Sequence, residues 1–176
     1  MSSIIKFKSN GTTYIDSSNA DKNFSFSKKV LSGNLHGSSC DSSMYKSIIT
    51  FDISRLQAYP IESASLCIFV DNINSSSSYY SNNTLSIYRN TNSFDINSVT
   101  WNNSPSSDSQ IYLDINPNDT FKYIKIDLNK YIDYWINNGN NYGITLEANN
   151  FYSSLIAFNS FNSQNPPLLF IEYKSI

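Results

Sequence analysis

Six aromatic residues lie in or beside Ser- and Asn-rich stretches of the sequence, where a ring can stay exposed to a ligand. They are Tyr79, Tyr80, Tyr112, Phe151, Tyr152 and Phe161. Exposed aromatic faces beside amide and hydroxyl groups are typical of a surface that binds carbohydrate. Tyrosines on a polar surface equally suit protein–protein contacts, because Tyr supplies a large contact area. The six residues therefore predict a surface that contacts a polysaccharide or another protein.

The side-chain sets of common enzymes are missing. His36 is the single histidine and lies in a polar segment, so any His-based catalytic triad would have to use this residue. Glu147 and Glu172, in late strand patterns, could form a carboxylate pair for glycoside hydrolysis. Charges at strand edges or on outward faces are the commoner explanation. We therefore expect a protein that is not an enzyme.

Oxygen ligands gather at residues 71–74 and 116–119. Asp and Asn side chains of this kind bind calcium in many sandwich domains, but neither stretch has the carboxylate density of a dedicated site. One histidine and two cysteines in different surroundings do not support a zinc site. We expect no cofactor, with a structural calcium ion left open.

The two cysteines differ in their surroundings. Cys67 lies in an apolar run at residues 65–70, which is typical of a buried thiol. Cys40 lies in a polar stretch and is expected to be exposed, where it could form a crosslink between chains.

The distribution of charged and apolar residues excludes two classes of partner, nucleic acid and the membrane interior. Twelve Lys and Arg face fourteen Asp and Glu, for a net charge of −2, and the basic residues are scattered. A nucleic-acid surface needs a dense basic patch, so no nucleic-acid partner is expected. No apolar run approaches the roughly 20 residues that span a bilayer, so no membrane insertion is expected. The first residues lack a signal peptide's apolar core, which predicts a processed chain or one made without an export signal.

The elements that position these residues are predicted to be short strands. Aromatic residues make up 15% of the chain and charged residues 15%, and Ser and Asn are abundant. Apolar runs separated by such turn residues indicate one domain over residues 1–176. We predict an all-β, jelly-roll-like sandwich of two antiparallel sheets with one short helix. The clearest strand patterns are residues 4–7, 12–15, 46–53, 63–70, 85–88, 98–101, 123–128, 142–147 and 168–173. Asn10-Gly11 is a hairpin signal between the first two.

The one helix is predicted from apolar residues that share a face at helical spacing. These residues are Leu128, Tyr131, Ile132, Trp135 and Ile136. Asp127 or Asn129 can cap its start, and Gly139 can end it in the left-handed conformation.

Three large aromatic residues are expected to anchor the core: Phe51, Trp101 and Trp135. Trp101 ends a predicted strand and precedes a polar turn that ends at Pro105. We therefore expect Trp101 to pack within the fold rather than to bind a ligand.

The order of these stretches resembles a known family. The matching stretches are residues 13–16, 47–54, 61–66, 85–88, 98–105, 126–128, 134–136, 141–144 and 167–173. Together they resemble the DNRLRE-type β-sandwich domains of bacterial surface proteins, which are related to alginate-binding carbohydrate-binding modules. The resemblance covers nearly the whole chain and implies the sandwich fold.

Two functions are consistent with these observations. The first is a non-enzymatic module of a bacterial cell wall, spore coat or spore appendage, which associates with itself or with other surface proteins. The alternative is a carbohydrate-binding module that recognises a polysaccharide. Both imply a location at the bacterial cell or spore surface or outside the cell. An acidic polysaccharide such as alginate would need a basic groove, which the scattered Lys and Arg do not predict.

Overall fold

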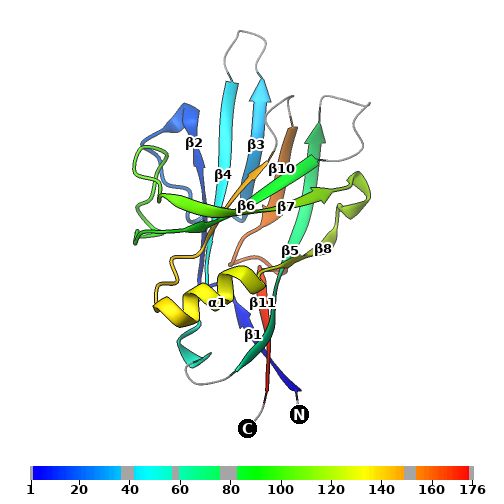
Figure 1. Ribbon diagram of the computed structural model, residues 1–176. Coiled ribbons are helices and arrows are strands. Elements are labelled where there is room, and N and C mark those ends of the chain that lie inside the picture. The colour runs from blue at the N-terminus through cyan, green and yellow to red at the C-terminus, as the bar shows by residue number, and fades with distance from the viewer. Residues whose placement is uncertain (1, 37–41, 57–59, 76–82, 149–153, 175–176) are drawn as a thin grey trace.

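The computed structural model describes residues 2–36, 42–56, 60–75, 83–148 and 154–174. Within these ranges the chain forms eleven strands, one α-helix and three short 3-10 helices (Figure 1). The strands are β1 (Ser2–Lys8), β2 (Gly11–Asp16), β3 (Lys29–His36), β4 (Ser42–Thr50), β5 (Ile61–Ser75), β6 (Asn83–Asn90), β7 (Ser107–Ile115), β8 (Lys122–Asp127), β9 (Ile144–Ala148), β10 (Ser154–Asn159) and β11 (Leu168–Lys174). The helix α1 spans Asn129–Asn138, and the 3-10 helices are η1 (Ser17–Asn19), η2 (Ser54–Leu56) and η3 (Pro117–Asp119). No helix in these ranges has the length and apolar character needed to span a membrane.

All described strand pairs are antiparallel and join into one hydrogen-bonded sheet. Its order is β1-β11-β5-β10-β3-β4-β9-β6-β7, with β2 paired to β4 and β8 paired to β5. The ribbon of β6 and β7 crosses in front of the other strands in Figure 1, so the sheet curls over on itself. The predicted all-β, sandwich-like fold with one helix is therefore confirmed.

Alternation along β5 shows how the sequence builds the core. Leu66, Ile68 and Val70 are fully buried, because every second residue of a strand points to the same face. Cys67 points to the opposite face and is half-buried. The prediction of a core thiol at Cys67 was wrong, because an apolar run was read as buried on both faces when only one is.

The helix follows its predicted pattern closely. Tyr131, Ile132 and Trp135 are buried, and Gly139 ends the helix with φ of 69°. The N-cap residue is Leu128, which makes no side-chain capping bond, rather than Asp127 or Asn129 as predicted. Asp127, one residue earlier, accepts a hydrogen bond from the Asn129 N–H at 2.8 Å. Ile136 is 37% exposed, so it does not complete the buried face as predicted.

Phe51 and Trp135 belong to the main core, as predicted, with 4% and 2% of their surface exposed. Trp101 does not belong to it. This side chain is half-buried and packs on a small separate cluster of Ile15, Ile48 and Val99. Trp101 therefore anchors a loop to the outside of the sheet rather than the core.

Two local predictions were wrong because side chains and long-range pairing decided the backbone. Asn10-Gly11 does not make a hairpin, since β1 pairs with β11 and β2 pairs with β4. Residues 98–101 form turns and bends rather than a strand. There Asp95 accepts hydrogen bonds from the backbone N–H of Asn97 and, through its carbonyl, of Val99, and these bonds compete with strand pairing.

Candidate functional site

A row of side chains crosses four neighbouring strands on the outer face of the sheet. Lys46 of β4 lies opposite Glu147 of β9, which lies opposite Ser86 of β6, which lies opposite Tyr112 of β7. Directly opposed residues of antiparallel strands project to the same face. The alternate residues Leu146 and Ile87 are fully buried in the core, so the row faces outward. Strands lie about 4.8 Å apart, so the row spans about 14 Å.

Tyr112 is the most exposed aromatic side chain of this face, with 65% of its surface accessible. Its hydroxyl donates to Gln110 Oε1 at 2.5 Å, and Gln110 Nε2 donates to Ser86 Oγ at 2.9 Å. Tyr88, two residues from Ser86 on β6, is half-buried beside them. Burial, and next the negative charge of Glu147, raise the pKa of Tyr88. The Tyr88 phenol therefore stays protonated at neutral pH and can donate or accept a hydrogen bond.

Trp101 closes the other end of the row. Lys46 Nζ lies 5.4 Å from the centroid of the Trp101 ring and 2.7 Å from Glu147 Oε1. These contacts hold the ammonium group between an aromatic face and a carboxylate. We call the surface formed by Lys46, Ser86, Tyr88, Trp101, Gln110, Tyr112 and Glu147 the sheet platform.

The sheet platform carries no excess of positive charge. Its lysine is paired with Glu147, and one residue pair further along the same face Thr84 Oγ1 donates to Asp114 Oδ1 at 2.7 Å. Two carboxylates thus accompany one ammonium group. A polyanion would meet repulsion on this face, whereas hydroxyl groups would find both donors and acceptors.

A bulge in β7 sets the direction of the platform strand. Ile87 opposes Ile111 and Arg89 opposes Asp108, so Ser109 and Gln110 together face the single residue Tyr88. Ser109 has φ of 54°, an uncommon conformation for a residue other than glycine. The Tyr131 hydroxyl of α1 contacts the carbonyl oxygens of both Ile87, at 2.7 Å, and Ser109. The helix therefore supports the bulge from beneath the sheet.

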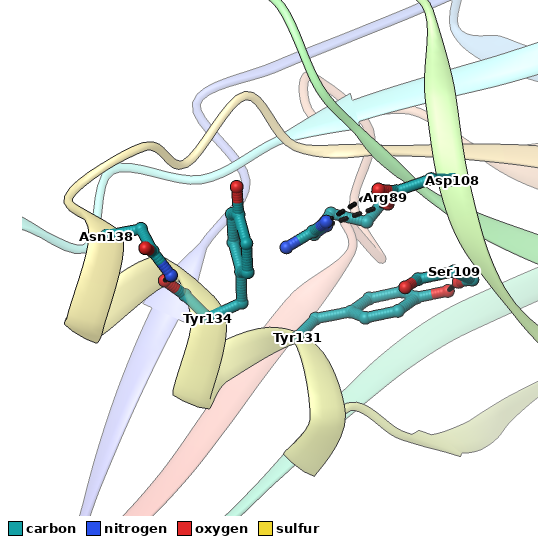
Figure 2. Close-up of polar contacts among 6 residues, drawn as sticks. All are labelled: Arg89, Asp108, Ser109, Tyr131, Tyr134 and Asn138. Atoms are coloured by element: carbon teal, nitrogen blue, oxygen red, sulfur yellow. Dashed lines mark hydrogen bonds and ion pairs between the residues drawn. The ribbon is translucent and has the colours of Figure 1, made fainter.

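An ion pair joins β6 to β7 in the same region, and its arginine packs on a tyrosine of the helix (Figure 2). Arg89 Nε and Nη2 donate to the two carboxylate oxygens of Asp108 at 3.0 and 2.7 Å. The guanidinium group also lies against the Tyr134 ring, with Cζ 3.2 Å from the ring centroid. A bidentate pair of this kind is geometrically specific, so β6, β7 and α1 hold one arrangement.

The structure separates the aromatic residues that the sequence grouped together. Tyr112 lies on strand β7 rather than in a loop, and it is part of the sheet platform. Phe161 lies in the turn after β10, half-buried, and its N–H donates to Thr12 Oγ1 of β2. Tyr79, Tyr80, Phe151, Tyr152 and Cys40 lie outside the described residues.

The carboxylates that the sequence offered for catalysis or for an ion are paired with nearby groups. Glu172 lies on β11 and accepts hydrogen bonds from Ser2 of β1 and Ser63 of β5. β11 is not a neighbour of β9, where Glu147 lies. Asp71 pairs with Lys29, and Asp119 caps the N–H of Asn116 at 2.8 Å. Across the described ranges no three His, Cys, Asp or Glu side chains gather as metal ligands. His36 is exposed at the end of β3.

Sequence reasoning missed four platform residues, Lys46, Ser86, Tyr88 and Gln110, and it considered Glu147 only as one of a catalytic carboxylate pair. A local signal existed in β6 and β7, where residues 85–88 and 110–114 alternate apolar with polar or aromatic side chains. That alternation indicates a strand with one buried face and one solvent-exposed face. It does not tell which strands lie side by side, so the platform itself follows only from the register.

Comparison with known proteins adds one match. The model of a family described as carbohydrate-binding module family 96 matches residues 3–173, which is nearly the whole chain. No curated protein matches the chain.

Proposed function

The chain belongs to carbohydrate-binding module family 96, and we propose that it is a non-catalytic module that binds a polysaccharide on the sheet platform. The observation that carries the proposal is the outward row from Lys46 to Tyr112, which combines an exposed aromatic ring with ordered polar groups. Family membership supports the polysaccharide alternative rather than the self-association role that the sequence suggested first.

The platform suits both the apolar C–H face and the polar hydroxyl groups of a sugar residue. The C–H face of a pyranose ring is apolar and packs on an aromatic ring such as Tyr112, while its hydroxyls need hydrogen-bond partners. Gln110, Ser86 and Glu147 offer such partners beside the ring. A row of about 14 Å contacts several consecutive sugar residues, which favours the interior of a chain over its end.

The charge of the platform supports a neutral polysaccharide. Lys46 is already paired with Glu147, and Asp114 adds a second carboxylate on the same face. An anionic polymer gains nothing from a lysine that is neutralised by its neighbour. A polysaccharide partner is consistent with the proposed location at a bacterial cell or spore surface or outside the cell.

A catalytic role has no support among the described side chains. Glu147 is held by Lys46 at 2.7 Å, so it is a hydrogen-bond partner rather than a general acid. Binding without turnover is the expected activity.

Isothermal titration with a panel of soluble polysaccharides tests the proposal. The panel contains neutral glucans, mannans and xylans together with an anionic polyuronate. We expect a neutral polymer to bind and Tyr112→Ala to weaken it about tenfold, since an aromatic stacking contact is lost. Phe26→Ala is the matched control, because Phe26 is 86% exposed and is not one of the platform residues. Equal binding by the wild type and Tyr112→Ala would contradict the platform as the binding site. Binding of the polyuronate alone would contradict the proposal that the ligand is neutral.

A further inference from the structure

The bulge in β7 reverses the direction of one charged side chain. Along this strand Ile111 packs against the core, whereas Gln110 faces outward on the platform. A regular alternation would place Asp108 on the same outward face as Gln110, because these residues are two positions apart. The extra residue Ser109 shifts the register by one, so Asp108 opposes Arg89 instead. The carboxylate therefore lies on the side of the sheet that faces α1.

This reversal decides which charges the platform carries. Arg89 packs on the Tyr134 ring of α1, so its partner Asp108 is also held on the helix side (Figure 2). Without the bulge, an unpaired carboxylate would stand beside Gln110 on the binding face. With the bulge, this part of the platform is uncharged. We call it the neutral half of the platform, formed by Ser86, Tyr88, Gln110 and Tyr112.

Tyr131 of α1 holds the bulge in this form. Its hydroxyl lies within hydrogen-bond reach of the carbonyl oxygens of Ile87, at 2.7 Å, and of Ser109. Burial raises the pKa of Tyr131, so the hydroxyl keeps its proton and donates it to these carbonyls. A bulge disrupts the strand ladder locally, so its buried backbone groups need partners from outside the sheet. Tyr131, which is fully buried, supplies one from the helix.

Gln110 connects the bulge to the neutral half of the platform. It directly follows Ser109, whose backbone has φ of 54°. The Gln110 side chain accepts from the Tyr112 hydroxyl at 2.5 Å and donates to Ser86 Oγ at 2.9 Å. A change of backbone conformation at Ser109 would turn this side chain and break both hydrogen bonds. The outward surface thus depends on a helix residue on the other side of the sheet.

We propose that Tyr131 is a positioning residue for the sheet platform: it fixes the bulge, and the bulge holds Gln110 and Tyr112 in the arrangement that binds a polysaccharide. Helix α1 therefore sets the affinity without touching the ligand. The choice of site rests on the proposed function. The role of the helix goes beyond it, because affinity falls in proportion to the fraction of molecules that leave the binding arrangement.

Two substitutions at Ser109 test the bulge. Glycine adopts positive φ readily, so Ser109→Gly should keep the bulge and bind like the wild type. A β-branched side chain disfavours positive φ, so Ser109→Val should drive the strand out of this conformation. Isothermal titration with the same neutral glucans, mannans and xylans should show about tenfold weaker binding for Ser109→Val. Equal binding by the two variants would contradict the role of the bulge.

Tyr131→Phe tests the helix side of the arrangement. Only the hydroxyl is lost, so the ring still fills the core, and we expect the dissociation constant to rise about three- to tenfold. Ile132→Val is the matched control, since Ile132 is the next residue of α1, is equally buried and has no hydrogen-bonding side chain. It should lower the melting temperature and leave binding unchanged. Equal weakening of binding by both variants would show that Tyr131 acts only through stability.

The Gln110 side-chain amide gives a reading that needs no polysaccharide. The chain contains three glutamines, so selective ¹⁵N-glutamine labelling yields three side-chain amide signals, and Gln110→Ala assigns the relevant one. In the free protein, Tyr131→Phe and Ser109→Val should move this signal toward that of a solvated amide. Ile132→Val and Ser109→Gly should leave it in place.

The outcomes separate the positioning role from the platform itself. If Tyr112→Ala weakens binding while Tyr131→Phe and Ser109→Val bind like the wild type, the positioning role is contradicted and the platform stands. An unmoved Gln110 amide signal in both variants would also contradict the positioning role. If Tyr112→Ala and Tyr131→Phe bind like the wild type while the Gln110 signal moves, the platform fails as the binding site and the coupling of α1 to Gln110 is supported.

Discussion

The guanidinium carbon of Arg89 lies 3.2 Å from the centroid of the Tyr134 ring, while the same group makes two hydrogen bonds to Asp108. One buried cation thus joins β6, β7 and α1. The two partners of the ion pair differ in exposure, because the Arg89 side chain is 8% exposed and that of Asp108 is 48% exposed.

This difference predicts unequal effects of removing either partner. Asp108→Ala leaves a buried guanidinium without its carboxylate and should cost about 2–4 kcal/mol of unfolding free energy. Arg89→Met leaves a carboxylate that water can reach and should cost about 1–2 kcal/mol. Urea unfolding at neutral pH measures both, and a larger loss for Arg89→Met would contradict the assignment.

The two tryptophans should differ in the same way. Trp135→Ala opens a large cavity in the main core and should destabilise the fold by about 3–5 kcal/mol. Trp101→Ala removes a half-buried ring from a small outer cluster and should cost about 1–2 kcal/mol. Thermal unfolding followed by circular dichroism gives the comparison. Complete unfolding of Trp101→Ala would restore this residue to the core, where the sequence placed it.

Two glycines with positive φ provide a matched pair. A Cβ on Gly33 would lie 2.0 Å from the carbonyl oxygen of Ser154, whereas a Cβ on Gly139 would meet nothing within 4 Å. We expect Gly139→Ala to cost about 1 kcal/mol, from the left-handed backbone alone, and Gly33→Ala to cost more than about 3 kcal/mol. The yield of soluble protein and its melting temperature report the difference, and similar values for both variants would argue against the close pairing of β3 and β10.

Stability should fall in alkaline solution. Burial raises the pKa of Tyr131 well above that of a free tyrosine, and it raises those of Tyr14, Tyr45, Tyr88 and Tyr123. Between about pH 10 and the raised values, the unfolded chain loses protons that the folded chain keeps. The stabilisation is therefore complete below about pH 10 and is lost as the pH rises further. Urea unfolding from pH 8 to pH 11 should show this fall, with a smaller slope in Tyr131→Phe.

Polysaccharide binding should depend weakly on salt. Lys46 and Glu147 cancel on the platform, so no counterions are released when a neutral chain binds. We expect the dissociation constant to change less than about threefold between about 0.05 and 0.5 M NaCl. A steep loss of affinity would instead indicate an anionic polymer held by lysines elsewhere on the surface.

Elements with a strong local period were predictable from the sequence. The spacing of Leu128, Tyr131, Ile132 and Trp135, followed by Gly139, located α1 closely because those residues bury one helical face. The alternation of Leu66, Ile68 and Val70 located β5 for the same reason. What failed was pairing, since nothing local in Asn10-Gly11 shows that β1 and β2 take different partners.

The sequence predicted the type of side chain at the candidate site, an aromatic residue beside polar groups, but not where the site lies on the fold. Tyr112 was identified because it follows a Ser-rich stretch, although the structure places it on β7 rather than in a loop. Lys46, Ser86 and Glu147 come from three other strands that are far apart in sequence. Their adjacency is a property of the register, which depends on core packing across the whole sheet.

The pairing of the first strand with the last has a mechanical consequence. Ser2 lies opposite Lys174, and both ends of the described chain emerge at the same end of the fold (Figure 1). Tension applied through both termini would separate β1 from β11 from that end, and it would break their hydrogen bonds one after another rather than all at once. Such a fold yields to a small force when it is stretched between two tethers. The fold resists a pulling force better when it is attached through one terminus and the force acts through the bound ligand.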